Sequence, residues 1–138
     1  MLTSQTKRSA IEKPNEHGID FVEAAVAHIE WRSRLRAHID GDATQDWPPS
    51  SAGNEDECGL GRWLRGMGRV KFGHFSAFRQ LEAGHSEFHY FAGLILSKVL
   101  EGQAKEAEAL LRNEFAQATR RILISINEMK ETMQQGTV

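Results

Sequence analysis

The stretch that decides the fold is residues 75–100, FSAFRQLEAGHSEFHYFAGLILSKVL. Apolar residues recur in it at spacings of three and four, which is the period of an amphipathic helix. The resulting stripe consists of Phe78, Leu81, His85, Phe88, Ala92, Ile95 and Val99. His85 is the polar member of this stripe, and Gly84 before it is expected to kink or interrupt the helix. The pattern predicts one long helix from about residue 75 to residue 100.

The segments on either side of this helix have the same period. Residues 19–39 predict a helix that Asp20 or Gly18 starts and Gly41 ends, and His28 lies in the middle of its apolar stripe. Residues 104–133 predict the last helix, whose apolar residues are spread broadly enough to face more than one partner.

The region between the first two helices is irregular in sequence. Residues 41–57 contain Pro48, Pro49 and several turn-forming residues, so they predict a loop. The acidic run that ends this loop suits the first turn of a short helix over about 56–65, which Gly66 ends. Strand signals are weak, so the predicted fold is all-α: a helix bundle of three sizeable helices and one short helix.

Length and composition fit a single domain and exclude several classes of protein. The 138 residues contain one Cys, so an internal disulfide is impossible and a disulfide-stapled secreted scaffold is excluded. A formal net charge of −2 argues against a general nucleic-acid-binding protein, which should carry a basic excess. A hydrophobic content of 40% is ordinary for a globular protein.

The chain shows no targeting signal. Residues 1–17 are polar and lack the apolar run of a signal peptide, so they are expected to be a disordered tail or linker. The longest apolar stretch, residues 90–100, is too short to cross a bilayer, and membrane insertion is not expected. We therefore expect a cytoplasmic protein whose helical domain covers residues 18–134, followed by a short tail over 135–138.

Four potential metal ligands stand on or near the predicted inward faces. His85 and His89 are four residues apart and share a helix face, His28 lies in the apolar stripe of the first helix, and Cys58 lies at the start of the short helix. Three imidazoles and one thiolate suit tetrahedral zinc, whereas magnesium and calcium prefer oxygen. Each residue also has a structural explanation, because buried His and Cys residues are often core residues that bind no metal.

The order and spacing of these residues resemble the chemoreceptor zinc-binding (CZB) domain family. The matching elements are His28-Ile29-Glu30-Trp31, Cys58-Gly59-Leu60-Gly61-Arg62-Trp63 and His85-Ser86-Glu87-Phe88-His89. The resemblance covers about residues 19–130. It implies an antiparallel four-helix bundle with a zinc site in its core and His28, Cys58, His85 and His89 as ligands.

The resemblance also implies a role. Such domains are regulatory modules, usually homodimeric, that occur on bacterial chemoreceptors and diguanylate cyclases and sense zinc or oxidants such as hypochlorous acid through the zinc-bound Cys. No signalling or cyclase region accompanies the domain here, so we expect either a stand-alone member that acts on such a partner in trans or a piece of a larger protein. No enzymatic activity is expected, because four protein ligands leave no position for a reactive water.

Three alternatives remain open at this point. Glu82 and His85 form an E-x-x-H element, as in non-haem di-iron bundles with an oxygen or redox function, although such sites need several carboxylates. The zinc site could instead be that of an enzyme, or it could be purely structural.

Around the site, Trp31 is expected to pack beside His28, and Glu30 or Asp20 is considered as a partner for a ligand imidazole. His38 and His74 match no motif and are expected at the surface or at helix ends.

Overall fold

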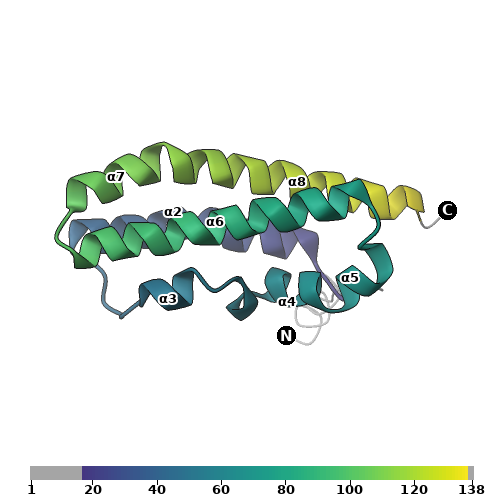
Figure 1. Ribbon diagram of the computed structural model, residues 1–138, viewed down its shortest axis with the longest axis horizontal. Coiled ribbons are helices and arrows are strands. Elements are labelled where there is room, and N and C mark those ends of the chain that lie inside the picture. The colour runs from purple at the N-terminus through teal and green to yellow at the C-terminus, as the bar shows by residue number, and fades with distance from the viewer. Residues whose placement is uncertain (1–16, 137–138) are drawn as a thin grey trace, which may run out of the picture.

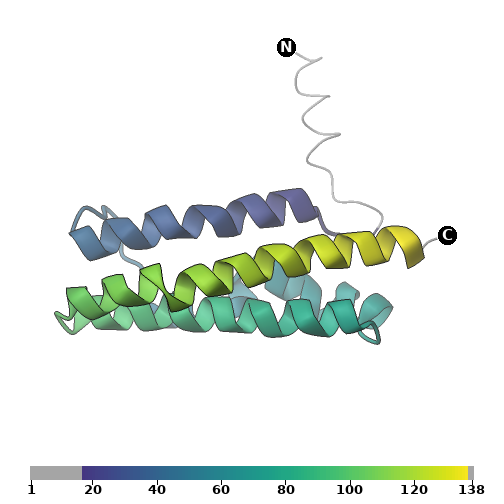
Figure 2. The same ribbon diagram turned by 90° about the horizontal axis from the view of Figure 1, so that it is seen from above.

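The computed structural model describes residues 17–136 as a bundle of four antiparallel columns (Figures 1 and 2). Three columns are long: α2, α6, and α7 continued by α8. The fourth column is a series of short helices that lies along α6, as Figure 1 shows. The elements are α2 (Phe21–Asp40), α3 (Pro49–Ala52), the 3-10 helix η1 (Glu55–Glu57), α4 (Gly59–Arg65), α5 (Met67–Phe72), α6 (Ser76–Leu100), α7 (Ala104–Arg112) and α8 (Glu114–Gly136). No strand occurs between residues 17 and 136, which confirms the predicted all-α bundle.

The first long helix begins and ends where the sequence predicts. The Asp20 carboxylate accepts a hydrogen bond of 3.0 Å from the backbone N–H of Glu23, which satisfies one of the free donors of the first turn. Gly41 ends α2 with a φ of 78°, a left-handed conformation that glycine adopts without strain. The predicted tail of residues 1–17 lies, except for His17, outside the described residues, as do residues 137 and 138.

The short column is more helical than the sequence indicates. The predicted loop of residues 41–57 contains α3 and η1, and the glycines after α4 are followed by α5 rather than by an irregular connection. Helices of four to seven residues are too short to show a period of 3.6, so the apolar pattern does not reveal them. Cys58 therefore lies at the junction of η1 and α4, not inside one continuous short helix.

The last column is one helix in the prediction and two in the structure. Asn113 separates α7 from α8 with φ −107° and ψ −85°, which is outside the helical region. Asn is a weak helix former, and its side chain competes for backbone hydrogen bonds. Beyond the break α8 continues to Gly136, three residues past the predicted end at residue 133.

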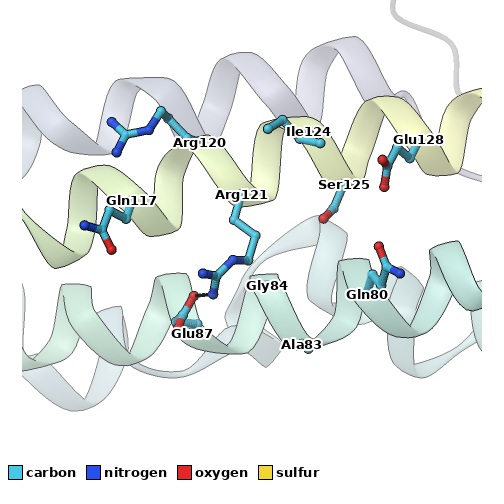
Figure 3. Close-up of a pocket in the computed structure, with 10 residues that line it drawn as sticks. All are labelled: Gln80, Ala83, Gly84, Glu87, Gln117, Arg120, Arg121, Ile124, Ser125 and Glu128. Atoms are coloured by element: carbon cyan, nitrogen blue, oxygen red, sulfur yellow. Dashed lines mark hydrogen bonds and ion pairs between the residues drawn. The ribbon is translucent and has the colours of Figure 1, made fainter.

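Gly84 does not interrupt α6, which is continuous from Ser76 to Leu100. Instead it faces α8 across a groove in which Arg121 pairs with Glu87 (Figure 3). A Cβ at Gly84 would lie 3.6 Å from Cγ of Arg121, an ordinary contact, so the glycine is not sterically required there. The groove is separate from the four predicted ligands, none of which lines it.

The exposed apolar side chains gather on α2 rather than on the last helix. Val22, Val26 and Ile29 are 61%, 48% and 52% exposed, and their spacing of four and three residues places them on one face. On α8, Ile124 is the large apolar side chain that is comparably exposed among the described residues. The broad apolar surface predicted for the last helix is therefore mostly buried, and α2 carries the unpartnered face. None of the helices between residues 17 and 136 has the length and apolarity that spanning a bilayer requires.

Candidate metal centre

The structure brings together the four side chains that the sequence singles out. His28 comes from α2, Cys58 from the η1–α4 junction, and His85 and His89 from α6. One donor atom of each lies within 4.8 Å of all the others. The three imidazoles are at most 2% exposed, and Cys58 is half-buried. The bundle thus places a compact set of three nitrogens and one sulfur in its interior.

The distances between the donor atoms fit one tetrahedral ion. Cys58 Sγ lies 3.5 Å from Nε2 of His28 and 3.5 Å from Nε2 of His85, and the Nε2 atoms of His85 and His89 are 3.0 Å apart. Bonds of about 2.0–2.1 Å to nitrogen and about 2.3 Å to sulfur give tetrahedral edges of roughly 3.3 Å and 3.5 Å, respectively. These three edges are close to those values, and the other donor pairs lie within 4.8 Å of each other.

Each Nε2 points inward because the other ring nitrogen faces an acceptor. Nδ1 of His28 donates to the Ala24 carbonyl oxygen at 2.7 Å, and Nδ1 of His89 donates to the Ala52 carbonyl oxygen at 2.9 Å. A carbonyl accepts only, so both rings carry the proton on Nδ1 and leave a lone pair on Nε2. This is the tautomer that a metal needs, and it comes from partners of the kind that orient metal-bound imidazoles.

The protonation states of the site also suit a cation. Burial lowers the pKa of His85, so its ring is neutral near pH 7. Burial would raise the pKa of Cys58, but the three imidazoles around its sulfur outweigh burial and lower that pKa to about 3. Cys58 is therefore a thiolate, the form that binds metal.

Aromatic side chains enclose the donors. Trp31 lies one turn after His28, as predicted, with its ring centroid 4.7 Å from that of His89. Phe88 is fully buried, and its centroid is 5.0 Å from that of His28. Trp47, from the loop before α3, packs on Trp31 at 4.8 Å. These rings exclude water and so strengthen electrostatic interactions at the donors.

Neither of the two carboxylates considered as a partner of a ligand imidazole takes that role. Asp20 is occupied as the cap of α2, and Glu30 is exposed, so neither reaches a ligand ring. The acceptors are instead two backbone carbonyls and, near His85, the carboxylate of Glu55 at 3.5 Å. The backbone acceptors have no sequence signal. Glu55 precedes Cys58 by three residues, but the acidic residues 55–57 have the pattern of an ordinary first helical turn and do not indicate a contact with the centre.

The remaining polar candidates lie away from the centre. Glu82 pairs with Arg69 and is not part of the donor group, so the E-x-x-H element does not form one side of a di-iron site. His38 lies in the last turn of α2 against Trp47, and His74 is exposed in the turn before α6, as expected for residues without a motif.

The Cys58 segment is held in place on both sides. Trp63 and Leu60 are buried and fix α4 against the bundle. Gly61 is packed so tightly that an added Cβ would lie 1.8 Å from the Glu55 carbonyl oxygen. Gly59, two residues earlier, has nothing within 4 Å of its Cβ position. One of the two glycines is therefore required by packing.

Comparisons with known proteins agree with this arrangement. The family model of the chemoreceptor zinc-binding domain matches residues 28–96, a span that contains all four donors and amounts to half of the chain. Searches of curated proteins and of solved structures gave no match. The matched sequence, the helical bundle and a His3Cys group able to bind a metal ion lead to one conclusion: this chain belongs to the chemoreceptor zinc-binding domain family.

Proposed function

We propose that His28, Cys58, His85 and His89 hold one Zn²⁺ and that the domain is a regulatory module. The signal is zinc availability or an oxidant that reacts with Cys58. The observation that carries this proposal is the donor group itself: three imidazoles, two of them with a tautomer fixed by a backbone carbonyl, and one thiolate, all within 4.8 Å. Zinc is favoured because imidazole and thiolate are its preferred ligands and the distances suit a tetrahedron.

Regulation fits this donor set better than catalysis does. A catalytic zinc keeps a position open for water or substrate, whereas here four protein donors surround one point. The imidazoles are buried, and aromatic rings cover the centre, so a substrate has no direct approach to the histidines. Cys58 is the most exposed of the four donors, and therefore the one that a small oxidant reaches first.

The chemistry of Cys58 makes it the responsive ligand. Its thiolate attacks the chlorine of hypochlorous acid, forming an S–Cl bond and releasing hydroxide. Water then displaces chloride, and the proton that it loses neutralises the hydroxide. A sulfenic acid remains, so sulfur loses two electrons and chlorine gains two. A sulfenic acid is a weaker metal ligand than a thiolate. Oxidation therefore loosens the one ligand that the η1–α4 junction contributes.

The segment that carries Cys58 is suited to move when this ligand is lost. It consists of helices of three to seven residues, which are marginal without tertiary contacts. The long helices α2 and α6 hold the three histidines and keep their own hydrogen-bonded backbones. We propose that residues 49–65 are docked with zinc and loosen without it, while the three long columns persist.

The test compares zinc content and affinity in the wild type, Cys58→Ala and Met67→Leu, before and after hypochlorous acid. Met67 is 47% exposed and controls for methionine oxidation. We expect one zinc per chain in the wild type and in Met67→Leu, with release on oxidation in both. Cys58→Ala should bind zinc more weakly and show no oxidant-dependent loss. If Cys58→Ala lost zinc under the oxidant as readily as the wild type, the thiolate would not be the sensor.

We also propose that the domain is a cytoplasmic homodimer that signals to a chemoreceptor or a diguanylate cyclase in trans. The apolar face of Val22, Val26 and Ile29 supports an interface on α2, because exposed apolar stripes of this kind mark contact surfaces. Sedimentation of Val26→Glu should show a monomer at concentrations where the wild type dimerises. Val70→Glu is the matched control, since Val70 is 85% exposed and lies on α5. A monomeric wild type at micromolar concentration would refute the dimer.

A further inference from the structure

The three imidazoles differ in what faces their outer nitrogen. For His28 and His89 it is a backbone carbonyl at 2.7 Å and 2.9 Å, a distance at which the hydrogen bond is fully formed. For His85 it is a side chain, the Glu55 carboxylate, at 3.5 Å. Nδ1 of His85 is buried and makes no hydrogen bond. A buried N–H group without an acceptor lowers the stability of the fold, so an acceptor near this nitrogen is expected.

Glu55 is held in position to supply that acceptor. The hydroxyl of Ser86, the residue after His85, lies 2.9 Å and 2.8 Å from the two carboxylate oxygens and donates to them. The same carboxylate therefore faces two consecutive residues of α6 from η1. Its side chain is 25% exposed, so the charge is partly shielded from water. A closure of about 0.6 Å brings Oε1 to ordinary hydrogen-bond distance from Nδ1.

We propose that Glu55 is a positioning residue of the metal centre, an inference that rests on the proposed zinc function. It accepts the Nδ1 proton of His85, fixes the tautomer that presents Nε2, and adds a negative charge beside a centre of net charge near +1. Carboxylate partners of this kind raise the basicity of a metal-bound imidazole, and their loss typically weakens metal binding by about 10–100-fold.

The position of Glu55 in the chain gives this contact a second consequence. Glu55 begins η1, and Cys58 ends it three residues later. Through Ala52, Glu55 and Cys58, residues 49–58 therefore touch the centre at three points: one carbonyl, one carboxylate and one thiolate. Ala52 contributes a backbone carbonyl and Cys58 is itself one of the four donors, whereas Glu55 contributes a side chain that is not a donor. Substitution there can thus separate the orientation of His85 from ligation itself.

The experiment uses Glu55→Ala, Glu55→Gln and two controls. Glu57→Ala removes the acidic side chain at the other end of η1. The Glu57 carboxylate accepts a hydrogen bond from the Ser51 hydroxyl at 2.7 Å and does not face the centre. Ser86→Ala removes the link between η1 and α6 but keeps the carboxylate. Zinc affinity is measured by competition with a chromophoric chelator. The tautomer of His85 is measured in the metal-free protein by long-range ¹H–¹⁵N NMR.

We expect Glu55→Ala to weaken zinc binding by about 10–100-fold, and Glu55→Gln, which keeps an acceptor oxygen, to recover part of that loss. Glu57→Ala should stay within about threefold of the wild type. Ser86→Ala, which releases the Glu55 carboxylate but does not remove it, should lose less affinity than Glu55→Ala. In metal-free Glu55→Ala the proton of His85 should no longer be confined to Nδ1. If Glu55→Ala bound zinc as well as Glu57→Ala, or if it left the His85 tautomer unchanged, the positioning role would be wrong. A wild type that binds no zinc would instead refute the proposed function, while the tautomer would still test Glu55.

Discussion

Replacing Gly61 by alanine tests how closely the Cys58 segment must fit the bundle. The added Cβ would lie 1.8 Å from the Glu55 carbonyl oxygen and 3.1 Å from Cε1 of His85, whereas ordinary contact begins at 3.4 Å. To lengthen this distance from 1.8 Å to 3.4 Å, the Glu55 carbonyl oxygen must move away by about 1.6 Å. Overpacking of this kind costs about 1–3 kcal/mol of folding stability.

The effect on metal binding should exceed the effect on stability. Cys58 is three residues from Glu55 and moves with it, while metal–ligand bonds tolerate changes of only about 0.2 Å. We therefore expect Gly61→Ala to lower zinc affinity by about 100-fold or more while α2, α6 and α8 persist. Competition with a chromophoric chelator measures the affinity, and far-UV circular dichroism checks the helices.

Gly59→Ala is the matched control for this prediction. Gly59 is the first residue of the same helix, and a Cβ there meets nothing within 4 Å. The substitution replaces a poor helix former by a good one, so it should change stability by no more than about 1 kcal/mol and leave zinc affinity unchanged. The reasoning is refuted if Gly61→Ala binds zinc within threefold of the wild type, or if both variants lose affinity equally.

Three further predictions concern pH, metal removal and helix capping. Because the folded pKa of Cys58 is about 3, against 9.0 for the unperturbed thiol, its thiolate contributes stability that is complete above pH 9 and gone below pH 3. Alkylation of the metal-free protein by iodoacetamide should accordingly change little between pH 5 and 8, whereas a tenfold rise per pH unit would contradict the lowered pKa. Removing zinc held at about 100 times its Kd should lower Tm by roughly 8–10 °C in calorimetry, and an unchanged Tm would mean that zinc does not stabilise the fold. Asp20→Ala should cost about 1 kcal/mol in urea denaturation, with Asp20→Asn close to the wild type, and equal losses in the two variants would show that the cap is not the cause.

The long helices were predictable because they are long. Over 20 and 25 residues, α2 and α6 repeat their apolar pattern several times, and their ends carry residues with a clear physical role, such as Asp20 and Gly41. The short helices α3 and α5 escaped prediction because fewer than two turns cannot establish a period. The break at Asn113 escaped because the apolar stripe continues across it.

The sequence by itself determined the composition of the centre. The spacing of His85 and His89 puts two imidazoles on one helix face, and the order of the three motifs indicates the zinc-binding family, which the match to residues 28–96 confirms. These features depend on covalent spacing and helical period, which are local properties of the chain. The role of the four residues as zinc ligands remains a prediction that the zinc measurements test.

Only the tertiary structure decided how the centre is built. It brings α2, the η1–α4 junction and α6 to one point, provides the carbonyls of Ala24 and Ala52 as acceptors, and places Glu55 beside His85. Backbone acceptors have no residue signature, and contacts between segments about 30 residues apart depend on how the columns pack. The sequence also does not indicate the tight fit at Gly61 or the exposure of the apolar face on α2. Both depend on which neighbouring element lies against a helix, and the helix's own sequence does not specify that neighbour.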